Sequence, residues 1–187
     1  MPLDPYRYDC VAHSFAQTIA NLVSRADNQG RLIVAWSEHD INQIKEAGIS
    51  RNLAKRVDKR YRNAKETVRK WGQACHPEWE FPRDKSGRAH RLIAYLDRIG
   101  YPVPDEHRGG TVGQSIKSIR GALDDGKTWA QMTERQRERW VALLAHNVCD
   151  LDGMRAVTEL AARGLTTGTP MVGWEESIGI WSRGGVK

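Results

Sequence analysis

Apolar residues recur at the spacing of an α-helix along most of the chain. In residues 11–27 the Val, Phe, Ile and Leu side chains fall at intervals of three and four, which places them on one face of a helix. Further helices are predicted over 38–47, over 89–99, and from Thr111 or Ser115 to Leu123. This pattern predicts a predominantly helical chain.

Two longer segments are also predicted to be helical. Ser50 is a suitable N-cap for a helix over 51–71. Thr133, followed three residues later by Gln136, fits a capping box at the start of a long late helix. Gly153 is the expected weak point of that helix, because glycine is a poor helix former.

One segment has the pattern of a β-strand. Residues 31–36 (RLIVAW) form a short, β-branched, almost wholly apolar run, which predicts a strand buried on both faces of a mainly parallel sheet. Together with the helices, this strand predicts an α/β fold. Residues 1–164 are predicted to form a single domain, and residues 165–187 a C-terminal tail rich in Gly and Thr.

The composition is that of an ordinary folded domain. Of the 187 residues, 40% are hydrophobic and 28% are charged, which excludes the disordered class. No apolar run approaches the roughly 20 residues that cross a bilayer, and the N-terminal residues lack the pattern of a signal peptide. We therefore expect no membrane partner and a cytoplasmic location.

Three widely spaced cysteines, Cys10, Cys75 and Cys149, are predicted to be free thiols in a reducing compartment. Each has a histidine nearby in sequence, but the absence of a C-x-x-C pair argues against a zinc site.

The positive charge is concentrated in one segment. Residues 51–70 hold nine Lys or Arg and two acids, a net of +7, so the rest of the chain sums to −1 within the total of +6. A basic ridge on a helix favours nucleic-acid phosphates as partners, although a solvated helix face is the ordinary alternative. The candidate phosphate contacts are Lys55, Arg56, Lys59, Arg60, Arg62, Lys65 and Arg69.

Two short motifs carry candidate chemistry. In IVAWSEHD, Glu38 and Asp40 follow the predicted strand, where α/β folds place their sites, although acids also favour any helix N-terminus. In AHNVCDLDGM, His146 and Asp150 lie four apart on one helix face. That pair suits metal-assisted hydrolysis, with Asp as ligand and His as base, or an ordinary i,i+4 contact.

The order of the two motifs resembles the second and third motifs of the DEDD-type 3′–5′ exonuclease superfamily. An apolar strand and SEHD come first, and HNVCD follows on a late helix; residues 90–104 (HRLIAYLDRIGYPVP) also look like a stretch of that family. The resemblance covers residues 31–164. It implies an RNase H-like core and hydrolysis of DNA or RNA with Mg²⁺ or Mn²⁺. It further implies Asp40 and Asp150 as metal ligands, Glu38 as an additional ligand and His146 as the base or the group that orients the water.

The first acidic motif of that family, Asp-x-Glu on the first strand, has no counterpart before residue 31. The expected RNase H-like core is therefore incomplete, and the chain is a fragment, a homologue without catalysis, or a different assembly of the acids. Two other function classes stay open. One is a non-catalytic nucleic-acid-binding module that uses the basic helix over 51–70, and the other is a helical scaffold for a protein partner.

Overall fold

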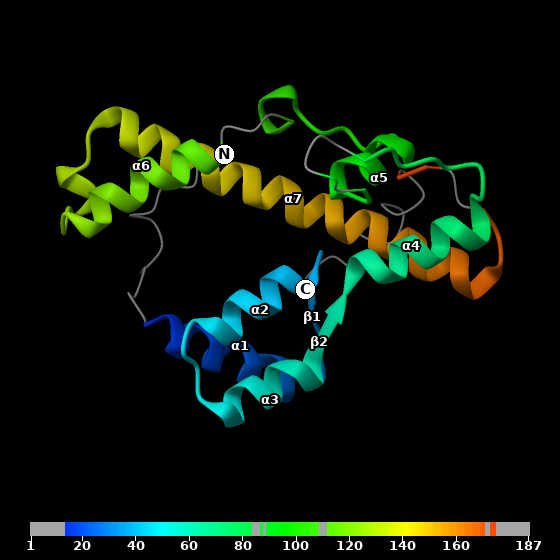
Figure 1. Ribbon diagram of the computed structural model, residues 1–187, viewed down its shortest axis with the longest axis horizontal. Helices are drawn as coiled ribbons and strands as arrows, with labels where there is room; N and C mark the ends of the chain where they lie inside the picture. Colours follow the sequence, from blue (N-terminus) through cyan, green and yellow to red (C-terminus); the bar gives the residue numbers. More distant parts are fainter. Residues whose placement is uncertain (1–13, 84–86, 88, 109–111, 171–172, 175–187) are drawn as a thin grey trace, which may run out of the picture.

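The computed structural model describes residues 14–83, 87, 89–108, 112–170 and 173–174. Within these residues the chain forms seven α-helices, two 3₁₀ turns and one pair of short parallel strands (Figure 1). The elements are α1 Phe15–Asn28, β1 Ile33–Ala35, α2 Glu38–Glu46, α3 Arg51–Arg60, β2 Tyr61–Asn63, α4 Ala64–Cys75, α5 Leu92–Arg98, η1 Asp105–His107, α6 Val112–Asp124, η2 Trp129–Gln131 and α7 Glu134–Thr167.

The long helix α7 is the central element of the fold, because α4, α5 and α6 all pack against it. Its 34 residues span about 51 Å at 1.5 Å per residue. α6 packs on its N-terminal half, while α4 and α5 pack on its C-terminal half (Figure 1). The predicted capping box at its start is confirmed, because Thr133 accepts a hydrogen bond from the Gln136 backbone and Gln136 accepts one from the Thr133 backbone. Gly153 does not interrupt the helix.

The larger hydrophobic core lies between α4, α5 and α7. Trp71, Tyr95 and Leu160 are among its fully buried side chains, and Val157 and Ala161 complete the face of α7 that meets them. α4 approaches α7 closely because Gly164 has no side chain at the point where the Trp71 indole lies.

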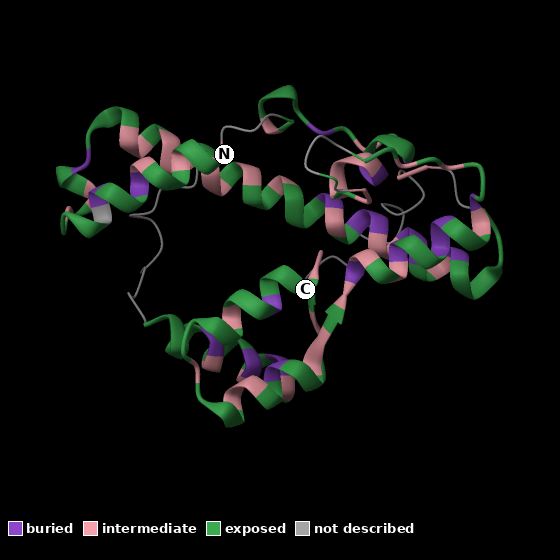
Figure 2. Ribbon diagram, in the orientation of Figure 1, coloured by how far each residue is buried: buried purple, intermediate pink, exposed green. Residues whose placement is uncertain are grey.

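A smaller core joins α1, α2 and α3 on the other side of the molecule (Figure 2). Ile19 and Val23 from α1 pack there with Ile41 from α2 and Val57 from α3. Each of these side chains is at most 6% exposed, so the three helices form a unit of their own.

The two strands connect the cores. β1 and β2 pair in parallel with Ile33 opposite Tyr61, and the Lys65 amide extends the ladder by donating to the Trp36 carbonyl at 3.2 Å. Ile33 packs on the smaller core, whereas Trp36, just past the end of β1, packs edge-on against Tyr95 of the larger one. β2 continues directly into α4, which ties the sheet to α7.

The expectation of an incomplete RNase H-like α/β core is wrong. The described residues are mostly helical, and their sheet has two strands of three residues each. The strand expected near 31–36 exists at Ile33–Ala35, but it is not buried on both faces, since Val34 is 39% exposed. Within the described residues this sheet gains no strand beyond β1 and β2, so it is too small to form the centre of an RNase H-like core.

The prediction of a single basic helix over 51–71 is also wrong. Ser50 does cap its start, accepting a hydrogen bond from the Leu53 amide, but the helix ends at Arg60. β2 follows, and Asn63 then caps α4 by accepting from the Glu66 amide at 3.3 Å. Strand pairing with β1 overrides the helix preference of this segment, which is a tertiary effect that local spacing does not reveal.

The other predicted helices and one further predicted helix cap are confirmed. Ser37 caps α2 in a capping box, and helices occur in the segments predicted for α1, α5 and α6. Residues 11–13 of the first predicted helix and residues 175–187 of the predicted tail lie outside the described residues. No helix in the described part of the chain combines the length and apolar character needed to span a membrane.

Gly164→Ala tests the close approach of α4 to α7. A Cβ at this position would lie 2.6 Å from Cδ1 of the buried Trp71 indole, which cannot move without disturbing the core. We expect the free energy of unfolding to fall by about 1–3 kcal/mol, as is typical of overpacking. Urea denaturation measures this. Gly121→Ala in α6, where nothing lies within 4 Å, is the control and should leave stability unchanged or raise it by up to about 1 kcal/mol.

Candidate functional site

A groove of about 470 Å³ lies between the end of β1, the start of α2 and the middle of α7. Asp40 and Asp150, which are far apart in sequence, both line it. The other lining residues are Val34, Ala35, Trp36, Leu92, Asn147, Leu151 and Met154. The groove therefore combines two carboxylates and an amide with a mainly apolar wall.

Asp40 is positioned by the capping box of α2. It is the third residue of the helix, and its Oδ2 accepts a hydrogen bond from the Ser37 amide at 3.4 Å. This contact is long, so it orients the carboxylate without satisfying both of its oxygens. The side chain is exposed, which leaves it accessible to a ligand from the groove.

Asp150 is positioned by α7. Its Oδ2 lies 3.4 Å from Nε2 of His146, one turn earlier on the same helix face. The Asp150 side chain is 52% exposed, whereas that of His146 is 17% exposed. Asn147, three residues before Asp150, also lines the groove and adds an amide oxygen beside the carboxylate.

His146 faces a different cavity from Asp40. It lines a small cavity of about 70 Å³ together with Glu106 and His107, and its ring centroid lies 5.5 Å from that of His107. The structure thus brings His146 to Asp150 but not into the groove lining. This placement favours a role in orienting Asp150 over direct contact with a reacting water.

Glu38 is in the first turn of α2 but does not line the groove. The part of the chain that the structure describes contains no group of three or more His, Cys, Asp or Glu placed to hold a metal ion. A cation in the groove would therefore rely on Asp40 and Asp150, with Asn147 as a neutral oxygen donor.

Tyr61 of β2 lies close to these acids and was not among the sequence candidates. Burial, followed by the negative charges of Asp40 and Glu38, raises the pKa of Tyr61 above its ordinary value. Its hydroxyl is buried and has no hydrogen-bond partner among the described residues. No pattern in the sequence predicts this contact, because it depends on the pairing of β1 with β2.

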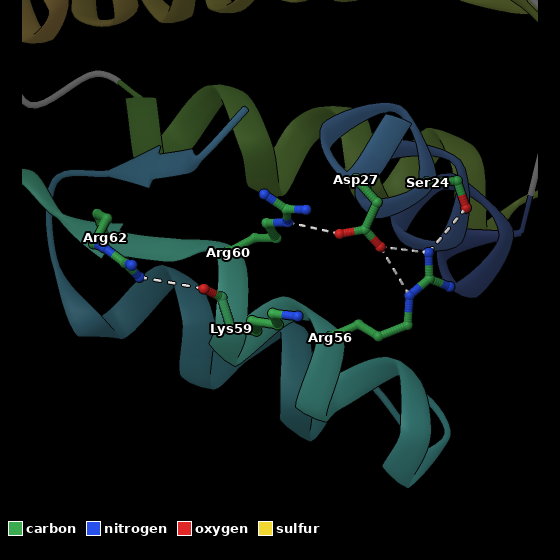
Figure 3. A network of polar contacts seen from close by, with 6 residues as sticks. All are labelled: Ser24, Asp27, Arg56, Lys59, Arg60 and Arg62. Atoms are coloured by element: carbon green, nitrogen blue, oxygen red, sulfur yellow. Dashed lines mark hydrogen bonds and ion pairs between the residues drawn. The ribbon is translucent and has the colours of Figure 1, made fainter. Parts of the chain in front are cut away.

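Two of the three arginines of α3, Arg56 and Arg60, are engaged within the molecule (Figure 3). Asp27 at the end of α1 accepts hydrogen bonds from Arg56 at 2.8 and 3.1 Å and from Arg60 at 2.6 Å. Arg56 also donates to the Ser24 hydroxyl at 3.3 Å. These two arginines bind α3 to α1, which competes with the predicted role in phosphate binding.

The other candidate basic residues do not form one ridge. Arg62 donates to the backbone carbonyl of Tyr61 at 2.6 Å and to that of Lys59 at 3.3 Å, and Figure 3 shows the contact with Lys59. Lys55 and Lys59 are exposed on α3. Lys65 and Arg69, in contrast, lie on α4, and both act electrostatically on His90. β2 separates the two groups, so the predicted ridge is divided between the helices at the two ends of this strand.

An aromatic cluster beside α5 is the second feature that the sequence did not reveal. Nδ1 of His90 lies 2.7 Å from the hydroxyl of the fully buried Tyr95, whose pKa burial raises to about 12. Phe81 packs on both rings, and Trp79 and His76 continue the cluster as a stacked pair. His90 and Tyr95 fall in the helix predicted over 89–99, and apolar periodicity does not indicate that His76, Trp79 and Phe81 pack beside it.

Comparison of the chain with protein-family models, curated proteins and solved structures finds no match.

Asp27→Asn tests how firmly the arginines are engaged. Hydrogen bonds from Arg56 and Arg60 hold the pKa of Asp27 below its ordinary value. A lowered pKa in the folded protein stabilises it fully above the unfolded value of about 3.9, and this contribution is lost as pH falls through the folded value. The wild type should therefore be more stable than the variant at pH 7.

The difference between wild type and Asp27→Asn should shrink as the pH falls below about 4. Urea denaturation between pH 7 and pH 3 measures it. Asp152→Asn, at an exposed position without an ion pair among the described residues, is the matched control and should change the pH profile far less. A constant difference between wild type and Asp27→Asn across this range would contradict the electrostatic origin of the pairing.

Proposed function

We propose that the chain is a divalent-metal-dependent nuclease that hydrolyses phosphodiester bonds of nucleic acid in the groove between α2 and α7. The observation that carries this proposal is the convergence of Asp40 and Asp150 on one groove from distant parts of the chain. The order of their two motifs, which resembles that of DEDD-type exonucleases, supports the same chemistry and suggests removal of terminal nucleotides.

The donor set fits one magnesium or manganese ion. Mg²⁺ prefers oxygen ligands, keeps several of its waters and is commonly bound by one or two carboxylates plus substrate phosphates. Asp40 and Asp150 would supply the carboxylates, and Asn147 an amide oxygen. When bound, such an ion lowers the pKa of a coordinated water and neutralises charge on the phosphoryl oxygens.

The residues of the chain itself prepare this site in two ways. The Ser37 amide and His146 each hold one carboxylate, which fixes its orientation before a ligand arrives. Trp36, Leu92 and Leu151 provide an apolar wall against which a sugar or base can pack while its phosphate meets the carboxylates. His146 acts as a positioning residue for Asp150.

The same acids argue against a binding module without metal at this groove. Two carboxylates facing a phosphate would repel it, unless a cation lies between them. A groove that served nucleic-acid binding alone would be expected to carry Lys or Arg, but its lining contains neither. The engagement of Arg56 and Arg60 by Asp27 also weakens the proposal of a basic helix as the main binding surface.

The test is cleavage of 3′- and 5′-labelled single-stranded DNA and RNA with Mg²⁺ or Mn²⁺. Asp40→Asn and Asp150→Asn should each reduce the rate at least about 100-fold, equivalent to about 2.7 kcal/mol of transition-state stabilisation. His146→Ala should reduce it about 10- to 100-fold, as expected for a residue that orients a ligand. The two labels report the direction of degradation.

Asp152→Asn is the matched control, since this acid is also exposed on α7 but does not line the groove. It should cleave at the wild-type rate. Absence of metal-dependent cleavage by the wild type, or equal cleavage by wild type and Asp150→Asn, would remove the nuclease proposal. Binding without cleavage would instead favour the non-catalytic module.

A further inference from the structure

A second cavity, of about 460 Å³, lies on the other side of the first turn of α5. Phe81 and His90 line it with their rings, and Ile93 and Ala94 contribute the apolar face of α5. The rest of the lining consists of Pro82 and four charged residues, Glu80, Arg91, Asp97 and Arg98. The cavity is therefore an apolar slot with a polar edge, which is the usual form of a site for a small planar group.

The rings of Phe81 and His90 are held in place by contacts with the buried Tyr95. The ring centroid of Phe81 lies 4.3 Å from that of Tyr95 and 5.1 Å from that of His90. His90 is further fixed by the 2.7 Å contact of its Nδ1 with the Tyr95 hydroxyl. Tyr95 is fully buried, so the core of the protein sets the positions of both rings.

The backbone of His90 supports the same conclusion. Its φ of 57° lies in the left-handed region, and His90 is the one residue other than glycine with a positive φ in the described part of the chain. Such strain persists where the surrounding structure imposes it, and it is concentrated at functional sites. Here it holds the imidazole against Tyr95 at the edge of the cavity.

Positive charge adjoins the rings. Burial and then the charges of Lys65 and Arg69 lower the pKa of His90 below its ordinary value, which favours the neutral imidazole. Neither Lys65 nor Arg69 has an ion pair with a described residue, unlike Arg56 and Arg60 of α3. They are therefore the two members of the basic segment best placed to meet a phosphate beside the cavity.

The acids near the cavity are partly neutralised. Asp97 lines it but forms an ion pair with Arg108 at 2.8 Å. Arg98, another lining residue, donates to the Glu80 carbonyl at 3.1 Å. These groups supply both donors and acceptors at the edge, as recognition of a heterocycle requires.

The cavity is adjacent to the groove proposed for hydrolysis. Leu92 lines the groove, whereas its neighbours Arg91 and Ile93 line the cavity. One turn of α5 thus separates the two spaces, and an extended chain that crosses this turn reaches both.

We propose that this cavity is a nucleobase subsite for single-stranded nucleic acid, in which one base stacks on Phe81 and His90 while Lys65 and Arg69 contact the flanking phosphates. The choice of nucleic acid rests on the proposed function, but binding at the cavity requires neither Asp40 nor Asp150. A base can enter such a slot only when it is unpaired, because stacking and pairing in a duplex hide its faces. Neutral aromatic rings suit this role for any base.

The test is binding of a fluorescein-labelled ten-nucleotide DNA or RNA, measured by anisotropy in EDTA so that no cleavage occurs. Phe81→Leu keeps an apolar side chain but removes the aromatic face. It should weaken binding about tenfold, within the range for loss of one stacked base. Phe15→Leu is the matched control, because Phe15 is the other phenylalanine of the chain and is exposed on α1, away from the cavity. It should bind like the wild type.

Two further probes separate stacking from a general loss of structure. An oligonucleotide of abasic sugars should bind wild type and Phe81→Leu equally, since it has no base to stack. Lys65→Gln and Arg69→Gln should each reduce the slope of log affinity against log salt concentration by about one. Thermal unfolding of Phe81→Leu confirms that the variant is folded at the assay temperature.

Equal binding of the labelled oligonucleotide by Phe81→Leu and Phe15→Leu would overturn the subsite. So would wild-type binding of a duplex that is as tight as that of the single strand. Asp150→Asn in the same EDTA assay keeps the two proposals apart, because it should bind normally even though it does not cleave. Loss of cleavage alone thus concerns the groove, and loss of base-dependent binding alone concerns the cavity.

Discussion

The contact between Trp71 and the side-chain-free surface at Gly164 determines how the rest of the molecule is arranged. It fixes the line along which α4 lies on α7. Because β2 runs without a break into α4, this line also fixes the strand, and pairing then places β1 beside it. Asp40 lies in the first turn of the helix that follows β1. Its approach to Asp150 is therefore a result of packing on α7, transmitted through two strands of three residues each.

The charged residues divide into those that hold the molecule together and those that are left for a ligand. Asp27 binds Arg56 and Arg60, two of the three arginines of α3, so much of the charge of this helix serves as a structural contact with α1. Lys65 and Arg69 lie beyond β2 on α4, and their charges act on His90 at the edge of the aromatic cavity instead. The net charge of +6 is thus a poor guide to where an anionic partner binds. The position of each acid therefore determines which Lys and Arg side chains can bind a phosphate. An arginine that is paired with an acid must leave that ion pair first.

Local structure was predictable from the sequence, and its assembly was not. Ser37, Ser50 and Thr133 are helix caps because short-range hydrogen bonds decide that role, and those depend on neighbours three residues away. β2 was not predicted, because residues 61–63 form a strand by pairing with β1, which is distant in sequence. The shared groove of Asp40 and Asp150 was expected from a resemblance to exonucleases, yet the RNase H-like core that came with that expectation is wrong. His90 and Tyr61 depend on tertiary contacts that no spacing rule encodes.

Because α7 is one long continuous helix, a small change of its tilt at one point displaces residues several turns away. Asp150 and Gly164 are fourteen residues apart on one continuous helix, a separation of about 21 Å. A tilt of only about 3° at the Trp71 contact would displace Asp150 by about 1 Å, and errors of that size are known to cost catalysis heavily. Residues that never approach a substrate are consequently under geometric constraint. Substitutions should therefore be tolerated least near the C-terminal end of α7, around Gly164, although this position is distant from Asp150.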